Sequence, residues 1–73
     1  MNADDAQALA EKARVDPTLY NIRRDSDGLC LVERLDGWHA FVSDRHVKFE
    51  HRAFGTEDEA CVYFLTRLFE LAF

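Results

Sequence analysis

An Asp-Gly pair at residues 36–37 separates two runs of alternating apolar residues, and it constrains the fold more than any other feature of the sequence. Both central residues of a type I′ turn need positive φ angles, which the pair Asp-Gly tolerates well. The flanking runs, residues 29–35 and 38–43, alternate as strands with one buried face do. We therefore predict an antiparallel hairpin with its two-residue loop at Asp36-Gly37.

The loop also predicts the register of the sheet. A two-residue loop at 36–37 pairs Glu33 with Ala40. A second short turn, at Arg45-His46, leads into a third strand at 47–54 and pairs Ala40 with His51. Because Ala40 is small, the side chains of Glu33 and His51 are expected to meet over it.

The same register divides the predicted sheet into two faces. The core face, which the C-terminal helix should cover, collects Leu29, Leu31, Leu35, Trp38, Val42, Val47 and Phe49. The opposite face collects Cys30, Val32, Arg34, His39, Phe41, Lys48, Glu50 and Arg52. This second face is either an ordinary exposed surface or a binding surface with an aromatic centre and a charged rim.

A helix is predicted at each end of the chain. The first spans residues 4–15, carries a narrow alanine-rich stripe, and ends at Asp16-Pro17 because the residue before proline avoids the helical region. The second begins after Thr56, the expected N-cap, with Glu59 reaching back to it, and runs from Glu57 to Phe73. Its apolar stripe is Ala60, Phe64, Leu68 and Leu71, widened by Cys61 and Leu65.

These elements predict an α+β fold in the order α-β-β-β-α, an antiparallel three-stranded meander with both helices packed on it. The short apolar segment 19–22 can add a fourth strand. With only 73 residues the chain is expected to form one domain. Within it, residues 1–16 form the N-terminal helical region, 19–54 the sheet and 56–73 the C-terminal helix.

The charge balance and the cysteines limit the classes of partner. Fourteen acidic residues against nine Lys and Arg give a net charge of −5, which argues against direct binding to nucleic acid or to an acidic membrane surface. No apolar run reaches the roughly 18 residues of a membrane span. The only cysteines, Cys30 and Cys61, are far apart in the sequence and predict free thiols in a reducing cytoplasm.

No motif in the sequence predicts catalysis, a metal or a cofactor. The three histidines lack the spacing of a metal site, and the register places His39 and His51 on opposite faces. Glu33 and His51 form the only candidate acid–base pair, and such a pair is more often a structural contact. We therefore expect a protein that is not an enzyme.

From Tyr20 to its end, about three quarters of its length, the chain resembles the small immunity proteins of bacterial polymorphic toxin–immunity systems. The motifs are Tyr20-Asn21-Ile22, Asp36-Gly37-Trp38, Val42-Ser43-Asp44-Arg45-His46, and Phe54-Gly55-Thr56-Glu57-Asp58-Glu59-Ala60-Cys61. Two positions depart from the family pattern, which has Glu at Asp44 and Gly at His46. The second departure bears on the tightness of the turn.

The resemblance implies a non-catalytic protein that binds a cognate toxin in the cytoplasm and occludes its active site. The acidic charge suits a basic toxin such as a nuclease. Candidate partner-binding residues are Asp44, Arg45, Phe41, Glu57, Asp58 and Glu59. The alternative is a regulatory or structural subunit that forms a homodimer through the C-terminal helix, using Val62, Phe69 and Phe73.

Overall fold

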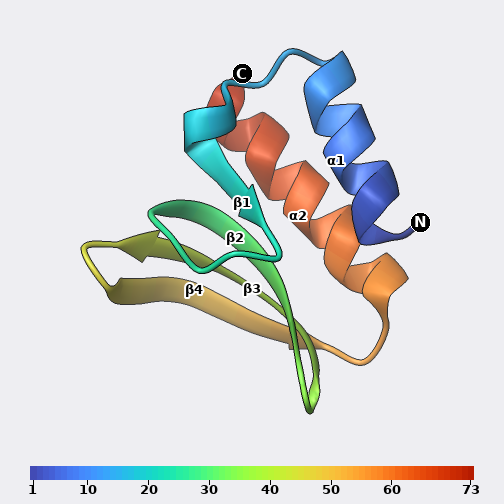
Figure 1. Cartoon of the computed structure of the whole chain (residues 1–73), viewed down its shortest axis with the longest axis vertical. Coiled ribbons are helices and arrows are strands. Elements are labelled where there is room, and N and C mark those ends of the chain that lie inside the picture. The colour runs from blue at the N-terminus through green and yellow to red at the C-terminus, as the bar shows by residue number, and fades with distance from the viewer.

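A four-stranded sheet in the order β1-β2-β3-β4 forms the centre of the computed structural model, which describes all 73 residues (Figure 1). The strands are β1 (Tyr20–Ile22), β2 (Gly28–Arg34), β3 (Gly37–Asp44) and β4 (Val47–Phe54). Helix α1 (Ala3–Lys12) precedes a short 3-10 turn at Pro17–Leu19, and helix α2 (Glu57–Ala72) follows the sheet. The α+β class is confirmed, and the segment at Tyr20 does form the fourth strand.

Strand β1 pairs with β2 in parallel, so the sheet is mixed rather than the fully antiparallel meander that was predicted. The five residues between the two strands fold back across the sheet. The buried side chain of Asn21 holds them by donating from Nδ2 to the carbonyl oxygens of Ser26 (3.2 Å) and Asp27 (2.8 Å). At Gly28 a Cβ would lie 2.8 Å from the Leu19 carbonyl oxygen, so only glycine permits this close return.

The β2–β3 hairpin forms, but its turn lies one residue earlier than predicted. Arg34 pairs with Gly37, so the two-residue loop is Leu35-Asp36. Ala40 therefore pairs with Leu31 and not, as was predicted, with Glu33. The positive φ angle, 124°, belongs to Gly37, the first residue of β3. A Cβ there would lie 2.7 Å from the Phe54 carbonyl oxygen, so Gly37 serves the approach of β4. Leu35, expected in the core, is fully exposed in the turn.

The β3–β4 turn lies at Arg45-His46 as predicted, and both residues have positive φ angles, 51° and 70°. Beyond it the register shifts by one residue between Ala40 and Val42, where Glu50 adopts a φ of 52°. Such a bulge inserts one extra residue into a strand. Ala40 therefore pairs with Arg52 instead of His51, and the predicted row of Glu33, Ala40 and His51 does not exist.

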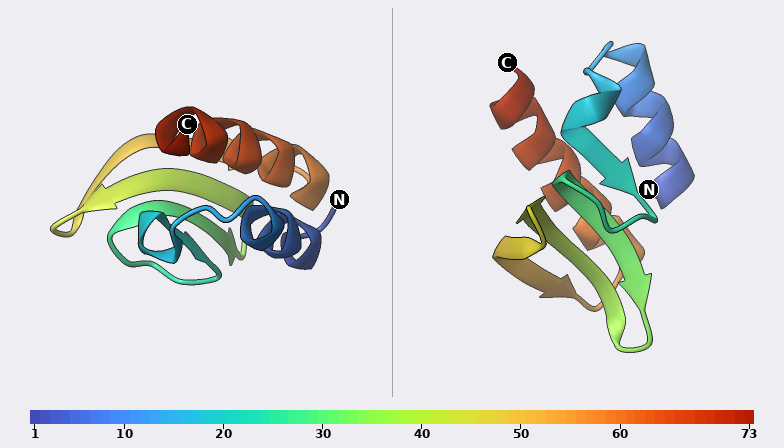
Figure 2. Two further views of the ribbon diagram at one scale, coloured as in Figure 1. Left: turned by 90° about the horizontal axis from the view of Figure 1, so that it is seen from above. Right: turned by 60° about the vertical axis from the view of Figure 1, so that its left-hand side comes forward.

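Helix α2 lies across one face of the sheet (Figure 2) and supplies five of the fourteen buried residues of the main core. Thr56 is the N-cap as predicted. Its hydroxyl accepts from the Glu59 backbone N–H (3.2 Å) and donates to the Glu59 carboxylate (3.1 Å). The buried stripe is Ala60, Cys61, Phe64, Leu65 and Leu68. Leu71, predicted within this stripe, is exposed near the end of the helix.

Helix α1 lies alongside α2 and contacts the sheet little, contrary to the prediction that both helices pack on it (Figure 1). Its buried residues are Ala3, Ala6 and Ala10. It begins after Asn2, which forms a capping box with Asp5, and ends at Lys12 rather than at residue 15. Arg14 takes a φ of 59° and the Val15 N–H bonds to the Ala10 carbonyl, so the chain turns away before it reaches Pro17.

We expect His46→Gly to stabilise the protein by about 0.5–1 kcal/mol, because a non-glycine residue at positive φ carries a steric cost that glycine lacks. Urea denaturation should show a higher midpoint. His46→Ala is the matched control, since it removes the imidazole but keeps the Cβ and should bring no such gain. Equal midpoints for both variants would mean that the turn is not strained at residue 46.

Candidate functional site

The sheet face away from α2 is covered, although the sequence suggested an exposed surface. Cys30, Val32 and Phe41 form a small apolar cluster on it, and Phe41 is fully buried. The loop after β1 covers one side of the cluster, with the Cys30 thiol donating to the Ser26 carbonyl oxygen at 3.0 Å. Phe41, one of the predicted partner-binding residues, therefore cannot touch a partner while this cover is in place.

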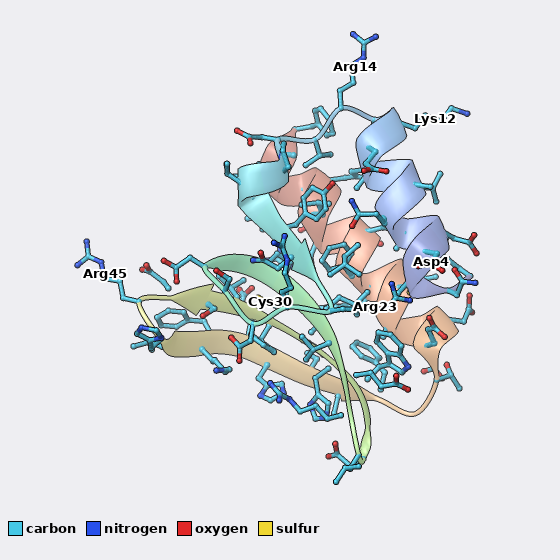
Figure 3. All side chains as sticks on the ribbon, viewed as in Figure 1. Asp4, Lys12, Arg14, Arg23, Cys30 and Arg45 are labelled. Atoms are coloured by element: carbon cyan, nitrogen blue, oxygen red, sulfur yellow. The ribbon has the colours of Figure 1, made fainter.

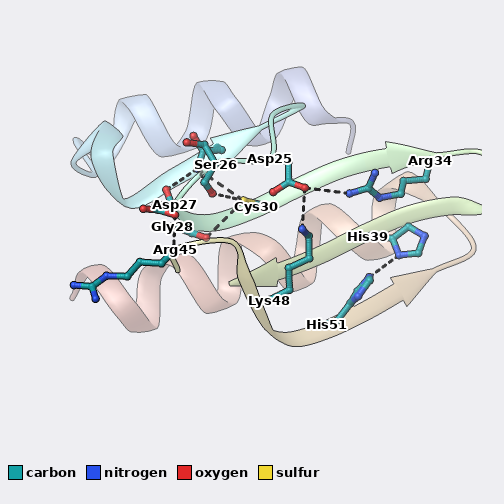
Figure 4. Close-up of polar contacts among 11 residues, drawn as sticks. Asp25, Ser26, Asp27, Gly28, Cys30, Arg34, His39, Arg45, Lys48 and His51 are labelled. Atoms are coloured by element: carbon teal, nitrogen blue, oxygen red, sulfur yellow. Dashed lines mark hydrogen bonds and ion pairs between the residues drawn. The ribbon is translucent and has the colours of Figure 1, made fainter. Parts of the chain in front are cut away.

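Charged side chains form the rest of the cover (Figure 4). Asp25 in the loop pairs with Lys48 of β4 (3.1 Å) and with Arg34 of β2 (3.5 Å). The Lys48 ammonium lies 5.2 Å from the centre of the Phe41 ring. The loop, β2 and β4 are thus joined above the aromatic ring, by ion pairs that are themselves partly exposed.

Two histidines and an aspartate continue this polar layer toward the β2–β3 turn. His39 Nδ1 lies 2.7 Å from His51 Nε2, and His39 Nε2 lies 2.8 Å from the Asp36 carboxylate. His39 is buried, whereas His51 is exposed and packs edge-on against Phe41 with ring centres 5.5 Å apart. The prediction that the two histidines lie on opposite faces is therefore wrong, because the bulge at Glu50 returns His51 to the face of His39.

No pattern in the sequence indicates this histidine chain. A glycine at position 50 would have indicated a bulge, but the residue is glutamate. Its left-handed conformation is accompanied by an ion pair with Arg67 of α2 (2.7 Å), so a contact between elements supports the bulge. The hydrogen bond from His39 lowers the pKa of Asp36, which keeps this carboxylate ionised.

The two cysteines lie in environments that favour the neutral thiol. Burial raises the pKa of the Cys30 thiol and, likewise, that of Cys61, so neither is an activated nucleophile. No group of three or more His, Cys, Asp or Glu side chains is arranged to hold a metal ion. The chain of Asp36, His39 and His51 can orient protons.

A shallow groove of about 630 Å³ lies between the edge strand β4 and helix α2. The Arg52 guanidinium lies 5.5 Å from the Tyr63 ring centre, and Arg67 bridges Glu50 (2.7 Å) and Glu70 (2.8 Å). Glu50 and then Glu70 raise the pKa of Arg67. The groove is polar, and its lining holds two guanidinium groups, Arg52 and Arg67, and the imidazole of His51 beside the single carboxylate of Glu50.

The predicted acidic contacts at the start of α2 are all engaged within the chain. Glu57 accepts the backbone N–H of Ala3 (2.7 Å), which is one of the unpaired amides at the start of α1. Asp58 pairs with the amino group of Met1 (2.9 Å) and raises its pKa. Glu59 accepts from Thr56. The structure brings these three residues together, but as caps of two helices.

The other predicted contacts, Asp44 and Arg45, lie at the tip of the β3–β4 hairpin, away from the start of α2. Arg45 projects from the tip (Figure 3), and none of the seven ion pairs involves Asp44. Val47 and Phe49, predicted to be core, are 53% and 48% exposed because α2 does not extend over this corner of the sheet. We call Asp44, Arg45, Val47 and Phe49 the hairpin-tip surface.

The residues of the alternative dimer interface lie on α2. Val62 and Phe73 are 50% and 82% exposed, while Phe69 is partly buried against the core and lies 6.0 Å from the Phe73 ring. The Thr66 hydroxyl between them donates to the Val62 carbonyl oxygen at 2.8 Å. The helix thus presents an apolar strip with residues spaced four, three and four apart.

Comparison with known proteins gives no family: no family model matches the chain, and no curated protein or solved structure is significantly similar to it. The likeness to immunity proteins therefore rests on the sequence motifs. No helix is long and apolar enough to cross a membrane.

A double-mutant cycle tests the histidine chain. We expect His39→Ala and His51→Ala to be coupled by about 0.5 kcal/mol or more in the free energy of unfolding, because their side chains share a hydrogen bond. The matched cycle of Glu33→Ala with His51→Ala should be additive within about 0.5 kcal/mol, since these side chains lie on opposite faces. Coupling between Glu33 and His51 together with additivity between His39 and His51 would contradict the bulge and favour the register that pairs Ala40 with His51.

Proposed function

We propose that this chain is a non-catalytic protein-binding module that neutralises a bacterial toxin in the cytoplasm by covering its active site. The motifs from Tyr20 onward support this proposal through their resemblance to immunity proteins. The observation that carries it is the hairpin-tip surface, where a half-exposed phenylalanine and valine stand beside an unpaired acid and an arginine.

The composition of this surface suits protein recognition. Interface centres are enriched in aromatic residues and arginine, and a few such residues carry most of the binding energy. Phe49 supplies the aromatic anchor and Arg45 the guanidinium, while Asp44 adds a negative charge that no neighbour neutralises. Phe49 and Val47 lie on β4, where the backbone is already paired with β3, so less conformational entropy is lost when they are buried than in an unpaired loop.

The net charge of −5 favours a basic partner. Because Glu57, Asp58 and Glu59 serve as helix caps, Asp44 is the better candidate for steering such a partner. Cys30 and Cys61 are both free, which fits a reducing compartment.

The first test is protection of cells. The protein encoded beside this chain's gene should arrest growth when it is expressed alone, and co-expression of the chain should restore growth. The two purified proteins should form a complex, with loss of the toxin's activity at equal molar amounts. A neighbour that is harmless, or one that kills equally with and without the chain, would contradict the proposal.

Association kinetics locate the surface on that complex. We expect Asp44→Lys to slow association by about tenfold at ~0.05 M salt and to have little effect at ~0.5 M, because rim charges act on the association rate and are screened by salt. Glu11→Lys is the matched control, with the same change of charge on exposed α1. It lies beside Lys12, at the far end of the molecule from Arg45 (Figure 3).

Phe49→Ala separates anchoring from steering. Loss of a buried aromatic anchor should accelerate dissociation by about tenfold or more and leave association nearly unchanged. Val62→Ala, at an exposed position of α2 outside the hairpin-tip surface, should leave both rates unchanged. If Val62→Ala were the damaging variant and Phe49→Ala neutral, the toxin would bind α2 instead of the hairpin tip.

The strip on α2 favours a homodimer as the second candidate. Val62, Thr66, Phe69 and Phe73 follow the spacing of a coiled-coil seam, and an antiparallel partner helix would set each large Phe73 against a small Val62. We expect sedimentation equilibrium to give twice the monomer mass of 8.5 kDa at high concentration. Phe73→Glu should restore the monomer, whereas Glu11→Lys should not. A monomer at all concentrations would remove this candidate.

A further inference from the structure

We propose that Asp36, His39 and His51 form an acid-sensitive latch that keeps the Phe41 cluster covered and releases it when the chain of hydrogen bonds takes up two protons. The latch concerns the sheet face opposite α2 and is independent of the toxin-binding proposal. Its parts come from the β2–β3 turn, the buried part of β3 and the bulged part of β4. Figure 4 shows the contact between His39 and His51.

The three groups allow only certain arrangements of protons. The ionised Asp36 carboxylate can only accept, so His39 must donate to it from Nε2. When both rings are neutral, His39 Nδ1 is then an acceptor, and His51 must donate from Nε2. Each of the two short contacts, 2.8 Å and 2.7 Å, has one donor and one acceptor in this state.

One additional proton fits the chain without loss of a hydrogen bond. It can enter at the outer nitrogen of His51, or His39 can become the cation and donate to both neighbours. In either case the positive charge lies within two hydrogen bonds of the Asp36 carboxylate. The hydrogen bond from His39 lowers the pKa of Asp36, which favours the ionised carboxylate as the counter-charge.

A second proton cannot be accommodated. It places an N–H of His39 against an N–H of His51 at a contact of 2.7 Å and brings two cations together. The hydrogen bond must break, and exposed His51 is the ring that can leave. The other charges of this layer are Asp25, Arg34 and Lys48; the two cations oppose the second proton, while Asp25 is already paired with both. His51 also lines the groove beside α2, together with Glu50, Arg52, Tyr63 and Arg67. Glu50 is paired with Arg67, and both guanidinium groups also oppose the second proton.

Departure of His51 changes what the surface offers. Its ring lies edge-on to Phe41, which is otherwise sealed by Lys48 and the loop after β1. Without this ring, Phe41 gains access to solvent beside Val32. The apolar cluster around Phe41 is therefore covered at neutral pH and exposed to solvent in acid, on a sheet face whose rim is polar.

Two measurements from about pH 8 to about pH 4.5 test the latch across the range in which histidine titrates. Nitrogen-15 NMR at the upper end should show both rings protonated at Nε2. Fluorescence of the neutral dye Nile red should rise about threefold at the acid end, as newly exposed apolar surface binds the dye. The near-ultraviolet circular dichroism of Trp38, in the main core on the other face, should persist and thereby separate opening from global unfolding.

Matched variants identify the ring responsible. His51→Gln should abolish the rise in dye fluorescence, because an amide can donate to neutral His39 or accept from the cation and never meets a second proton. His46→Gln removes an exposed histidine outside the chain and should behave like the native protein. Either of two results would overturn the latch: proton assignment to His39 Nδ1 at about pH 8, or an equal rise in the His51→Gln variant.

Discussion

The packing of α2 against the sheet is the interaction on which the other elements depend. Phe64, Leu65 and Leu68 enter the core, and full burial of each such side chain is worth about 1.5–3 kcal/mol. Tyr20 of β1 packs edge-on against Phe64, with ring centres 6.2 Å apart, so the short edge strand is held partly by the helix. Helix α1 buries little besides alanine and is fixed to α2 through Glu57 and Asp58.

This dependence explains why the acidic cluster belongs to the fold. Carboxylates at a helix N-terminus stabilise the helix dipole, and here two of them also bind the start of a second helix. One short acidic segment thus caps α2 and attaches α1. The protein surface retains negative charge elsewhere, at places such as Asp44 where no intramolecular partner competes with a binding partner.

The bulge at Glu50 is a strained point of the backbone that determines where Phe49 and His51 lie. A left-handed non-glycine residue costs of order 1–2 kcal/mol, and here the Glu50–Arg67 ion pair and the contacts of His51 accompany it. The bulge interrupts the free edge of β4, which discourages sheet-to-sheet aggregation. It also leaves Phe49 on the α2-facing side, at the uncovered corner, while His51 joins His39 on the opposite face.

The sequence by itself determined the order of the two helices and the three longer strands, the cap at Thr56 and the turn at Arg45-His46, because each depends on residues close along the chain. Only the tertiary structure decided the position of the β2–β3 turn, the parallel pairing of β1 with β2 and the packing of α1 against α2. It also decided the chain of Asp36, His39 and His51. These features arise where separate elements meet: Gly37 serves β4, Asn21 holds the loop beside β2, and Arg67 of α2 pairs with Glu50. Local patterns could not reveal them, because the alternation of residues along one strand does not show whether that strand or its partner contains an extra, bulged residue.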